Sequence, residues 1–140
     1  MSEERTQYET GDVVDASELP AMLKRGSKYH AVKTWSELCQ REFDSKAEAI
    51  RGEELWLMQE ASEIGHLVFQ PEPFVLSMKP KITYQPDYSY EVDGHVCYED
   101  CKGLITRELR VKVVWLFEKY KHRIMITTKT KDGWKAKYLV

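Results

Sequence analysis

The chain has 140 residues, of which 42% are hydrophobic and 31% charged, with a formal net charge of −2. This length fits one compact domain, and the apolar content suffices for a buried core, so wholesale disorder is excluded. No apolar run approaches the roughly 18 residues of a membrane-spanning helix, and the acidic start lacks the apolar segment of a signal peptide. Three cysteines without a CxxC pair complete the expectation of a reduced, cytoplasmic protein with no structural zinc.

The small net charge hides an uneven distribution. Residues 102–140 hold eleven Lys/Arg against three Asp/Glu, a net charge of +8, while the other 101 residues carry −10. Such an asymmetry hints at a polyanionic partner. A solvated, lysine-rich helix and hairpin would have the same composition, so the charge alone does not identify the partner.

Residues 1–27 are predicted to form an acidic, loosely ordered N-terminal arm, and residues 28–140 a single domain. The role of the arm stays open, because its charges serve equally to cover a basic surface or to aid solubility. The first clear element is a helix over about 45–63. Ser45 followed three residues later by Glu48 makes a capping box, apolar residues recur at helical spacing, and Gly65 is the expected stop.

Short strands are expected over 67–70 and 74–76, where prolines interrupt a β-rich sequence. Residues 82–102 predict a β-hairpin with an Asp-Gly turn, which is the strongest short-range hairpin signal. A second helix over about 106–120 follows, and then strands at 124–128 and 134–139 around another Asp-Gly turn. This order of elements predicts a mixed α/β layered fold.

The hairpin turn at residues 93–94 brings two acidic residues together. A two-residue loop pairs Val92 with His95, and Asp87 then lies opposite Asp100 with the Cβ atoms about 4.5–5.5 Å apart. Lys102 points to the same face, two residues beyond Asp100. Facing like charges destabilise a sheet unless a cation neutralises them, and Mg²⁺ prefers carboxylate oxygen. Alternatively, Asp87 only starts a strand and Lys102 forms a surface ion pair with Asp100.

These residues carry a resemblance to known nucleases. Pro86-Asp87, followed after twelve residues by Asp100-Cys101-Lys102, matches the PD-(D/E)XK pattern of restriction-endonuclease-like enzymes. The wider sequence over about residues 28–126 resembles a small phage-encoded family of such nucleases, catalogued as a domain of unknown function. The further residues of this likeness are Phe43 to Glu48, Gly65, Gln70-Pro71, Ile82 to Tyr84, Gly103, Thr106 and Lys112.

The resemblance implies a restriction-endonuclease-like core, with a central mixed β-sheet flanked by helices, and a Mg²⁺-dependent endodeoxyribonuclease in which Mn²⁺ substitutes. It assigns metal binding to Asp87 and Asp100 with help from Glu48, and makes Lys102 the catalytic lysine. Asp100 stands where the pattern more commonly has Glu. Glu48 also fits a structural role, in which its carboxylate accepts a hydrogen bond from the backbone of the capping residue. Glu99 points to the opposite face and is excluded as a ligand.

Seven polar or basic residues are candidate contacts to nucleic acid: Lys28, Lys33, Gln70, Thr106, Arg107, Arg110 and Lys112. The last four lie on the second predicted helix, where phosphate contact and simple solvation predict the same residues. Few residues remain for a base-reading domain, so we expect cutting of branched DNA, such as a Holliday junction in phage recombination. A homodimer without membrane association is the expected form.

Two other functions stay open at this stage. A catalytically inactive nuclease fold would bind DNA or protein without forming product. A protein that binds a small molecule or a host factor through its acidic arm would show no salt-dependent DNA binding.

Overall fold

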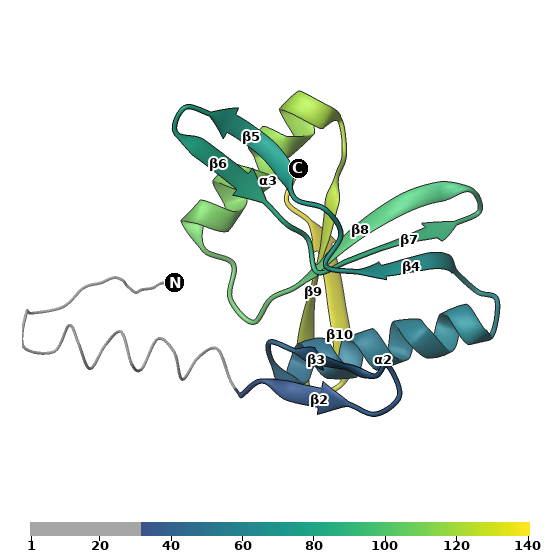
Figure 1. Cartoon of the computed structure of the whole chain (residues 1–140). Helices are drawn as coiled ribbons and strands as arrows, with labels where there is room; N and C mark the ends of the chain where they lie inside the picture. Colours follow the sequence, from purple (N-terminus) through teal and green to yellow (C-terminus); the bar gives the residue numbers. More distant parts are fainter. Residues whose placement is uncertain (1–31) are drawn as a thin grey trace, which may run out of the picture.

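The computed structural model describes residues 32–140, which form three layers around a five-stranded mixed sheet (Figure 1). Its strand order is β10-β9-β8-β7-β4. The strands are β4 (Gly65–Phe69), β7 (Tyr88–Val92), β8 (His95–Cys101), β9 (Ile124–Thr130) and β10 (Gly133–Tyr138). β8 and β9 pair in parallel, whereas the other neighbours pair antiparallel. The predicted mixed α/β class is therefore confirmed, while the N-terminal arm and Lys28 lie outside the described residues.

One face of the sheet is covered by α2 (Lys46–Glu60), which itself packs on a small hairpin of β2 (Thr34–Ser36) and β3 (Arg41–Phe43). The helix begins as predicted, because the Ser45 hydroxyl accepts a hydrogen bond from the Glu48 amide at 3.1 Å. Its buried side is made by residues at a spacing of three, namely Ala49, Gly52 and Leu55. No element was predicted where β2 and β3 lie, since strands of three residues are too short to show a period.

The end of α2 differs from the sequence expectation. The helix stops at Glu60, and Ser62 just beyond its C-cap adopts a left-handed backbone with φ of 63°. Gly65 is instead the first residue of β4. A serine in the left-handed conformation ends this helix without the glycine that such a position usually favours, so the assignment of Gly65 as the stop is wrong.

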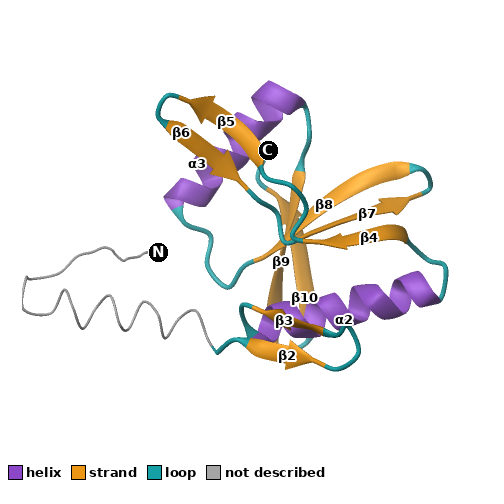
Figure 2. Cartoon of the chain, viewed as in Figure 1, coloured by secondary structure: helices purple, strands orange, loops and turns teal. Residues whose placement is uncertain are grey.

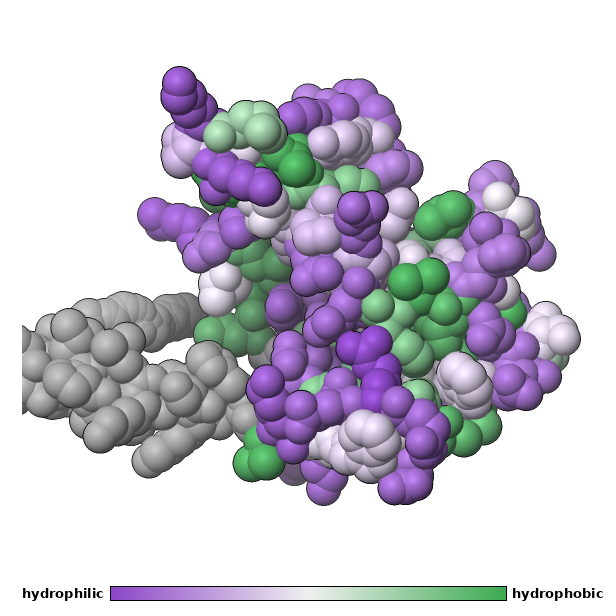
Figure 3. All heavy atoms as spheres, viewed as in Figure 1, coloured by the Kyte–Doolittle hydropathy of each residue, from purple (hydrophilic) through white to green (hydrophobic). Residues whose placement is uncertain are grey.

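The opposite face of the sheet is covered by α3 (Arg107–Tyr120) and by the hairpin of β5 (Phe74–Met78) and β6 (Lys81–Tyr84) (Figure 2). The core between them combines helix residues at the expected spacing with strand residues from β9; its buried members include Leu109, Val113, Leu116, Ile124 and Ile126. Hydrophilic side chains dominate the β2–β3 end of the face seen in Figure 3, and apolar ones show toward its middle. No helix in the described part of the chain is long and apolar enough to cross a membrane.

The predicted hairpin over 82–102 is right in its turn and wrong in its first strand. Val92 pairs with His95 and Tyr90 with Cys97, which is the register that a two-residue Asp-Gly loop imposes. Residues 81–84 do not extend this ladder but form β6, paired with β5. Pro86 lies in the irregular segment between β6 and β7, where it has no N–H to donate to a ladder.

Glu99 lies fully buried on the α2 face of the sheet, away from Asp100. Its carboxylate accepts a bidentate pair of hydrogen bonds from Arg51 of α2, at 2.6 and 3.1 Å. The hydroxyls of Tyr90 and Thr127 donate to it as well, at 2.7 and 2.9 Å. Four donors therefore compensate this charge inside the protein, and its predicted orientation away from the candidate ligands is confirmed.

We expect Arg51→Met to lower the free energy of unfolding by about 3–5 kcal/mol, because it leaves the Glu99 carboxylate buried without its cation. Urea denaturation measures the loss. Adding Glu99→Gln should recover part of it, since a neutral amide has no charge to compensate. Glu108→Gln is the control, because the side chain of Glu108 is 77% exposed and its ion pair is worth at most about 1 kcal/mol. Equal losses of unfolding free energy in Arg51→Met and Glu108→Gln would contradict a special role for the buried pair of Arg51 and Glu99.

Candidate functional site

The four residues assigned to catalysis and metal binding, Glu48, Asp87, Asp100 and Lys102, are called the candidate site below. Two backbone hydrogen bonds fix its strands. The Lys102 amide donates to the Thr127 carbonyl of β9 at 2.9 Å, and the Gln70 amide donates to the Asp87 carbonyl at 2.8 Å. The site therefore sits where the end of β8 meets the residue before β7, on a backbone held from both sides.

Asp100 is completely buried, and its two carboxylate oxygens have different surroundings. Oδ2 accepts a hydrogen bond from the Tyr84 hydroxyl and lies 3.8 Å from the Lys102 ammonium. Oδ1 is buried and, when Asp87 is ionised, accepts no hydrogen bond from any residue between 32 and 140. A buried carboxylate oxygen without a partner is costly, so this atom is suited to bind a cation or a donor from a ligand.

Asp87 lies one residue before the last paired position of the hairpin, which is Tyr88 opposite Glu99. Its Oδ2 accepts a hydrogen bond from the Cys101 amide at 2.9 Å. Burial, the negative charge of Asp100 and a hydrogen bond between the protonated Asp87 carboxyl and the Asp100 side chain, in that order, raise the pKa of Asp87 from 3.8 to about 8. The two aspartates therefore repel each other when both are ionised, and they face each other as the hairpin register predicted.

Glu48 reaches the same group from the first turn of α2, which the Tyr88 hydroxyl holds by donating to the Glu48 carbonyl at 2.7 Å. Burial is the main cause that raises the pKa of Glu48 to about 7, and the charges of Asp87 and Asp44 add to it. A hydrogen bond with the backbone of Asp44 lowers it, so the carboxylate does take a local partner at the helix start. The side chain therefore senses both the helix start and the aspartates.

Lys102 supplies the positive charge of the candidate site. Burial alone would lower its pKa, but the charges of Asp100, Asp87 and Glu48 outweigh burial and raise the pKa above its ordinary value of 10.5. Lys102 is therefore protonated at neutral pH and suited to stabilise negative charge. The neighbouring Cys101 thiol, whose pKa burial and these acids raise to about 12, is not a thiolate nucleophile.

The acids do not form a finished metal cluster. Among residues 32–140, no three His, Cys, Asp or Glu side chains are gathered closely enough to hold an ion together. Asp87 and Asp100 make a pair, and Glu48 is near enough to interact with them through its charge. The donor set still suits Mg²⁺, because it offers carboxylate oxygens, one of them without a partner in the described part of the chain.

A cavity of about 380 Å³ opens beside the candidate site and gathers some of the predicted nucleic-acid contacts. Tyr84, Lys102, Thr106 and Lys112 line it. Thr106 is also the N-cap of α3, where its hydroxyl accepts a hydrogen bond from the Leu109 amide at 3.1 Å. The cavity therefore joins the start of α3 to Lys102.

Other predicted contacts lie apart from this cavity. Arg107 and Arg110 are exposed on α3, whereas Lys33 is exposed just before β2, in the layer that covers the other face of the sheet. Gln70 is exposed and contributes its backbone amide, rather than an observed side-chain bond, to the strand next to Asp87. The predicted nucleic-acid contacts are thus divided between the two faces of the central sheet.

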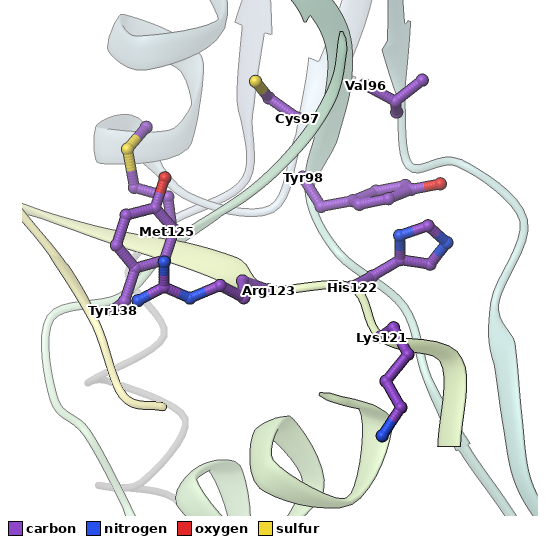
Figure 4. A pocket seen from close by; sticks show the side chains of 8 residues that line it. All are labelled: Val96, Cys97, Tyr98, Lys121, His122, Arg123, Met125 and Tyr138. Carbon is purple, nitrogen blue, oxygen red and sulfur yellow. The ribbon is translucent and has the colours of Figure 1, made fainter. Parts of the chain in front are cut away.

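A separate hollow of about 230 Å³ lies where α3 ends and β9 begins (Figure 4). In it the His122 ring packs against Tyr98, with 5.1 Å between centroids, and the Arg123 guanidinium lies 4.1 Å from the Tyr138 ring. Residues of the candidate site do not line it. The two cations that line it, Lys121 and Arg123, thus lie over the rings of Phe117 and Tyr138.

Two residues that matter to the candidate site and its sheet were not assigned a role from the sequence. Tyr84 donates to Asp100, and Arg51 pairs with Glu99 on the opposite face. Tyr84 belongs to the residues that carry the family likeness, but the likeness assigns it no function. Arg51 gave no local signal, because its partner is 48 residues away in the chain.

Comparison with known proteins identifies a family but not an activity. The family model described as "Protein of unknown function (DUF1064)" matches residues 26–133. No curated protein matches the chain. The match covers the whole candidate site and helices α2 and α3, and it agrees with the expected likeness to a domain of unknown function.

The raised pKa values predict how the stability of the metal-free protein depends on pH. The folded state binds more protons than the unfolded state between the ordinary carboxyl pKa of about 4 and the folded value of about 8, so stability falls as pH rises through this window. We expect Asp87→Asn to flatten this fall and to stabilise the protein by about 0.5–2 kcal/mol at pH 8. Denaturation in EDTA from pH 4 to 8 measures it.

Asp93→Asn is the matched control, because it makes the same chemical change in the exposed turn of the same hairpin. The amide oxygen that Asp87→Asn introduces can still accept the hydrogen bond from the Cys101 amide, so that bond is not lost. A pH slope that is unchanged in Asp87→Asn would contradict the electrostatic strain assigned to this carboxyl.

Proposed function

We propose that this chain, which belongs to the DUF1064 family of proteins of unknown function, is a metal-dependent endodeoxyribonuclease. One observation carries the proposal. Oδ1 of buried Asp100, which has no partner among the described residues, lies beside a second strained carboxyl, that of Asp87, with the protonated Lys102 next to them. Two carboxylates can hold a metal ion and a lysine can stabilise negative charge, which are the functions that metal-dependent phosphodiester hydrolysis uses.

Each residue of the candidate site has a distinct role in this proposal. Asp87 and Asp100 would hold Mg²⁺, and Glu48 would complete the set from α2. When bound, the ion supplies a Lewis acid and an activated water. Lys102 stabilises the negative charge that develops on the scissile phosphate, since its ammonium stays protonated at neutral pH. Tyr84 orients Asp100 by its hydrogen bond to Oδ2.

DNA is the proposed substrate because the positive charge of the chain is concentrated after residue 101. Helix α3 presents part of that charge beside Lys102 through Lys112, and Arg107 lines the adjoining surface while Arg110 is exposed on the same helix. Such residues bind phosphates without reading sequence. Branched DNA is therefore the proposed target, and the proposal includes a homodimer, because paired incisions across a junction need two sites. The phage context rests on the family likeness alone.

A second candidate function follows from the missing third ligand. Because the described acids do not gather three together, the fold also suits a DNA-binding module that does not cut. Such a module would bind DNA in a salt-dependent manner, with or without Mg²⁺, and would never yield product.

Cleavage assays separate these two functions. We expect the wild-type protein with Mg²⁺ or Mn²⁺ to cut branched DNA, in the form of a four-way junction or a flap, faster than linear duplex DNA, and to cut nothing in EDTA. Asp100→Asn and Lys102→Ala should each slow cleavage by about 100-fold or more, because the first removes a carboxylate proposed to hold the metal ion and the second removes the ammonium that stabilises the reacting phosphate. Gel analysis of labelled DNA gives the rates.

The controls for this assay are Asp93→Asn and Lys135→Ala, which make comparable charge changes at exposed positions on the turn and on β10. Both should cut like the wild type. Cleavage unaffected by Asp100→Asn and Lys102→Ala would refute the site assignment, and DNA binding without product under every metal condition would favour the inactive module.

Metal binding has a readout that does not depend on turnover. We expect Mg²⁺ to raise the melting temperature of the wild type at pH 8, since a ligand at 100 times its Kd stabilises the folded state by about 2.7 kcal/mol. Differential scanning fluorimetry measures the shift, which Asp100→Asn should abolish and Asp93→Asn should retain. A shift of equal size in both variants would place the ion elsewhere.

A further inference from the structure

We infer that the groove between β6 and α3 binds a single-stranded segment of DNA and leads it to the candidate site. This inference names the form of the substrate and so rests on the proposed nuclease function. The name "α3 groove" is used below for the surface lined by Lys81, Ile82, Thr83, Arg107, Glu108, Val111, Lys112 and Trp115.

The α3 groove is continuous with the cavity of the candidate site. It encloses about 650 Å³, and the adjoining cavity about 380 Å³. Thr83, Glu108 and Lys112 line both, so the two hollows adjoin. The joint path runs from Trp115, in the second half of α3, to Lys102 next to Asp100. Each hollow is of a size that holds a small ligand, so together they fit a few units of a chain.

The charge along this path suits a polyanion. Lys81, Arg107 and Lys112 stand on the two sides of the α3 groove, against one acid, Glu108. The Glu108 carboxylate forms an ion pair with the Lys112 ammonium at 3.2 Å, and the side chain of Glu108 is 77% exposed. An exposed pair of this kind is worth at most about 1 kcal/mol, so a phosphate can displace the carboxylate from Lys112. The remaining cations are exposed on β6 and on the first turn of α3.

The apolar wall of the α3 groove distinguishes unpaired from paired strands. Val111 is 53% exposed, and it lines the groove with Ile82 and the half-buried Trp115. A duplex stacks its bases internally and offers phosphates to such a surface. An unpaired base offers a flat π-face that stacks on an indole ring and covers apolar side chains. Cations combined with an accessible aromatic ring are therefore the features of a single-strand path.

Binding of a labelled 16-nucleotide strand, measured by fluorescence anisotropy in EDTA, tests the α3 groove with the full chain and without cleavage. We expect the wild type to bind this strand at least tenfold more tightly than the duplex of the same sequence. Lys81→Ala/Arg107→Ala should weaken binding and make the slope of log K against log salt shallower by about 1.4, the value for two lost phosphate contacts. Trp115→Leu should weaken binding by about five- to 150-fold, with the slope unchanged.

Lys135→Ala/Lys137→Ala is the matched control, because it removes two exposed positive charges from β10, outside the α3 groove. It should leave the affinity for the single strand unchanged. Equal loss in the control and in Lys81→Ala/Arg107→Ala would overturn the inference, as would equal affinity for strand and duplex. Since Trp115 packs against the core, thermal melting must show each variant folded, and the exposed double variant keeps the test independent of Trp115.

The same proteins distinguish a failure of the inference from a failure of the proposed function. Groove-dependent binding of the strand, with no cleavage of any DNA under Mg²⁺ or Mn²⁺, supports the α3 groove and refutes the nuclease. Cleavage that depends on Asp100, with groove variants that bind and cut like the wild type, supports the nuclease and refutes the groove.

Discussion

The two-residue turn at Asp93 and Gly94 sets β7 against β8, and the position of every charged residue in this part of the sheet follows from that register. Side chains alternate between faces along a strand, so the turn places Asp100 and Lys102 on the face toward α3, and Glu99 on the face toward α2. A shift of one residue would exchange these faces. It would move Glu99 away from Arg51 and Asp100 away from Tyr84, so both sets of contacts require the same register.

The two adjacent acids of β8 are buried to the same degree but are compensated very differently. Glu99 receives four hydrogen bonds, two of them from a guanidinium, and therefore stabilises one arrangement of α2 on the sheet. Asp100 has Tyr84 and a more distant Lys102 on one oxygen and, within residues 32–140, no partner on the other. The four hydrogen bonds to Glu99 show that this sheet can supply donors to a buried carboxylate, yet the adjacent Asp100 receives fewer. The incomplete set around Asp100 is the kind of strain that proteins keep at sites that bind ligands.

Local signals in the sequence predicted the elements on which the candidate site stands, and non-local contacts account for what was missed. The Ser45 cap, the apolar spacing of α3 and the Asp-Gly turn each depend on residues a few positions apart, so sequence alone places them. Tyr84 stands at the end of β6, which pairs with β5 and does not extend the hairpin of β7 and β8. Its contact with Asp100 therefore depends on how these elements pack, which no short window of sequence indicates. The α3 groove likewise arises between two elements distant in sequence, and so its lysine on β6 was not among the predicted contacts.

An acidic candidate site at the end of a basic path would repel DNA if all its carboxyl groups were ionised. Bound protons or bound cations neutralise these carboxyl groups, and the two compete for them. Burial and neighbouring negative charges raise the pKa of Glu48 to about 7 and that of Asp87 to about 8, so near neutral pH Asp87 is largely protonated and Glu48 about half protonated until a cation replaces the protons. A strand arriving along the α3 groove therefore meets less negative charge than the formal count of acids suggests. Any ion that binds must displace protons, so metal affinity rises with pH while the apo fold loses stability. The strain at Asp87 and Asp100 and the affinity for a cation are thus two consequences of one arrangement.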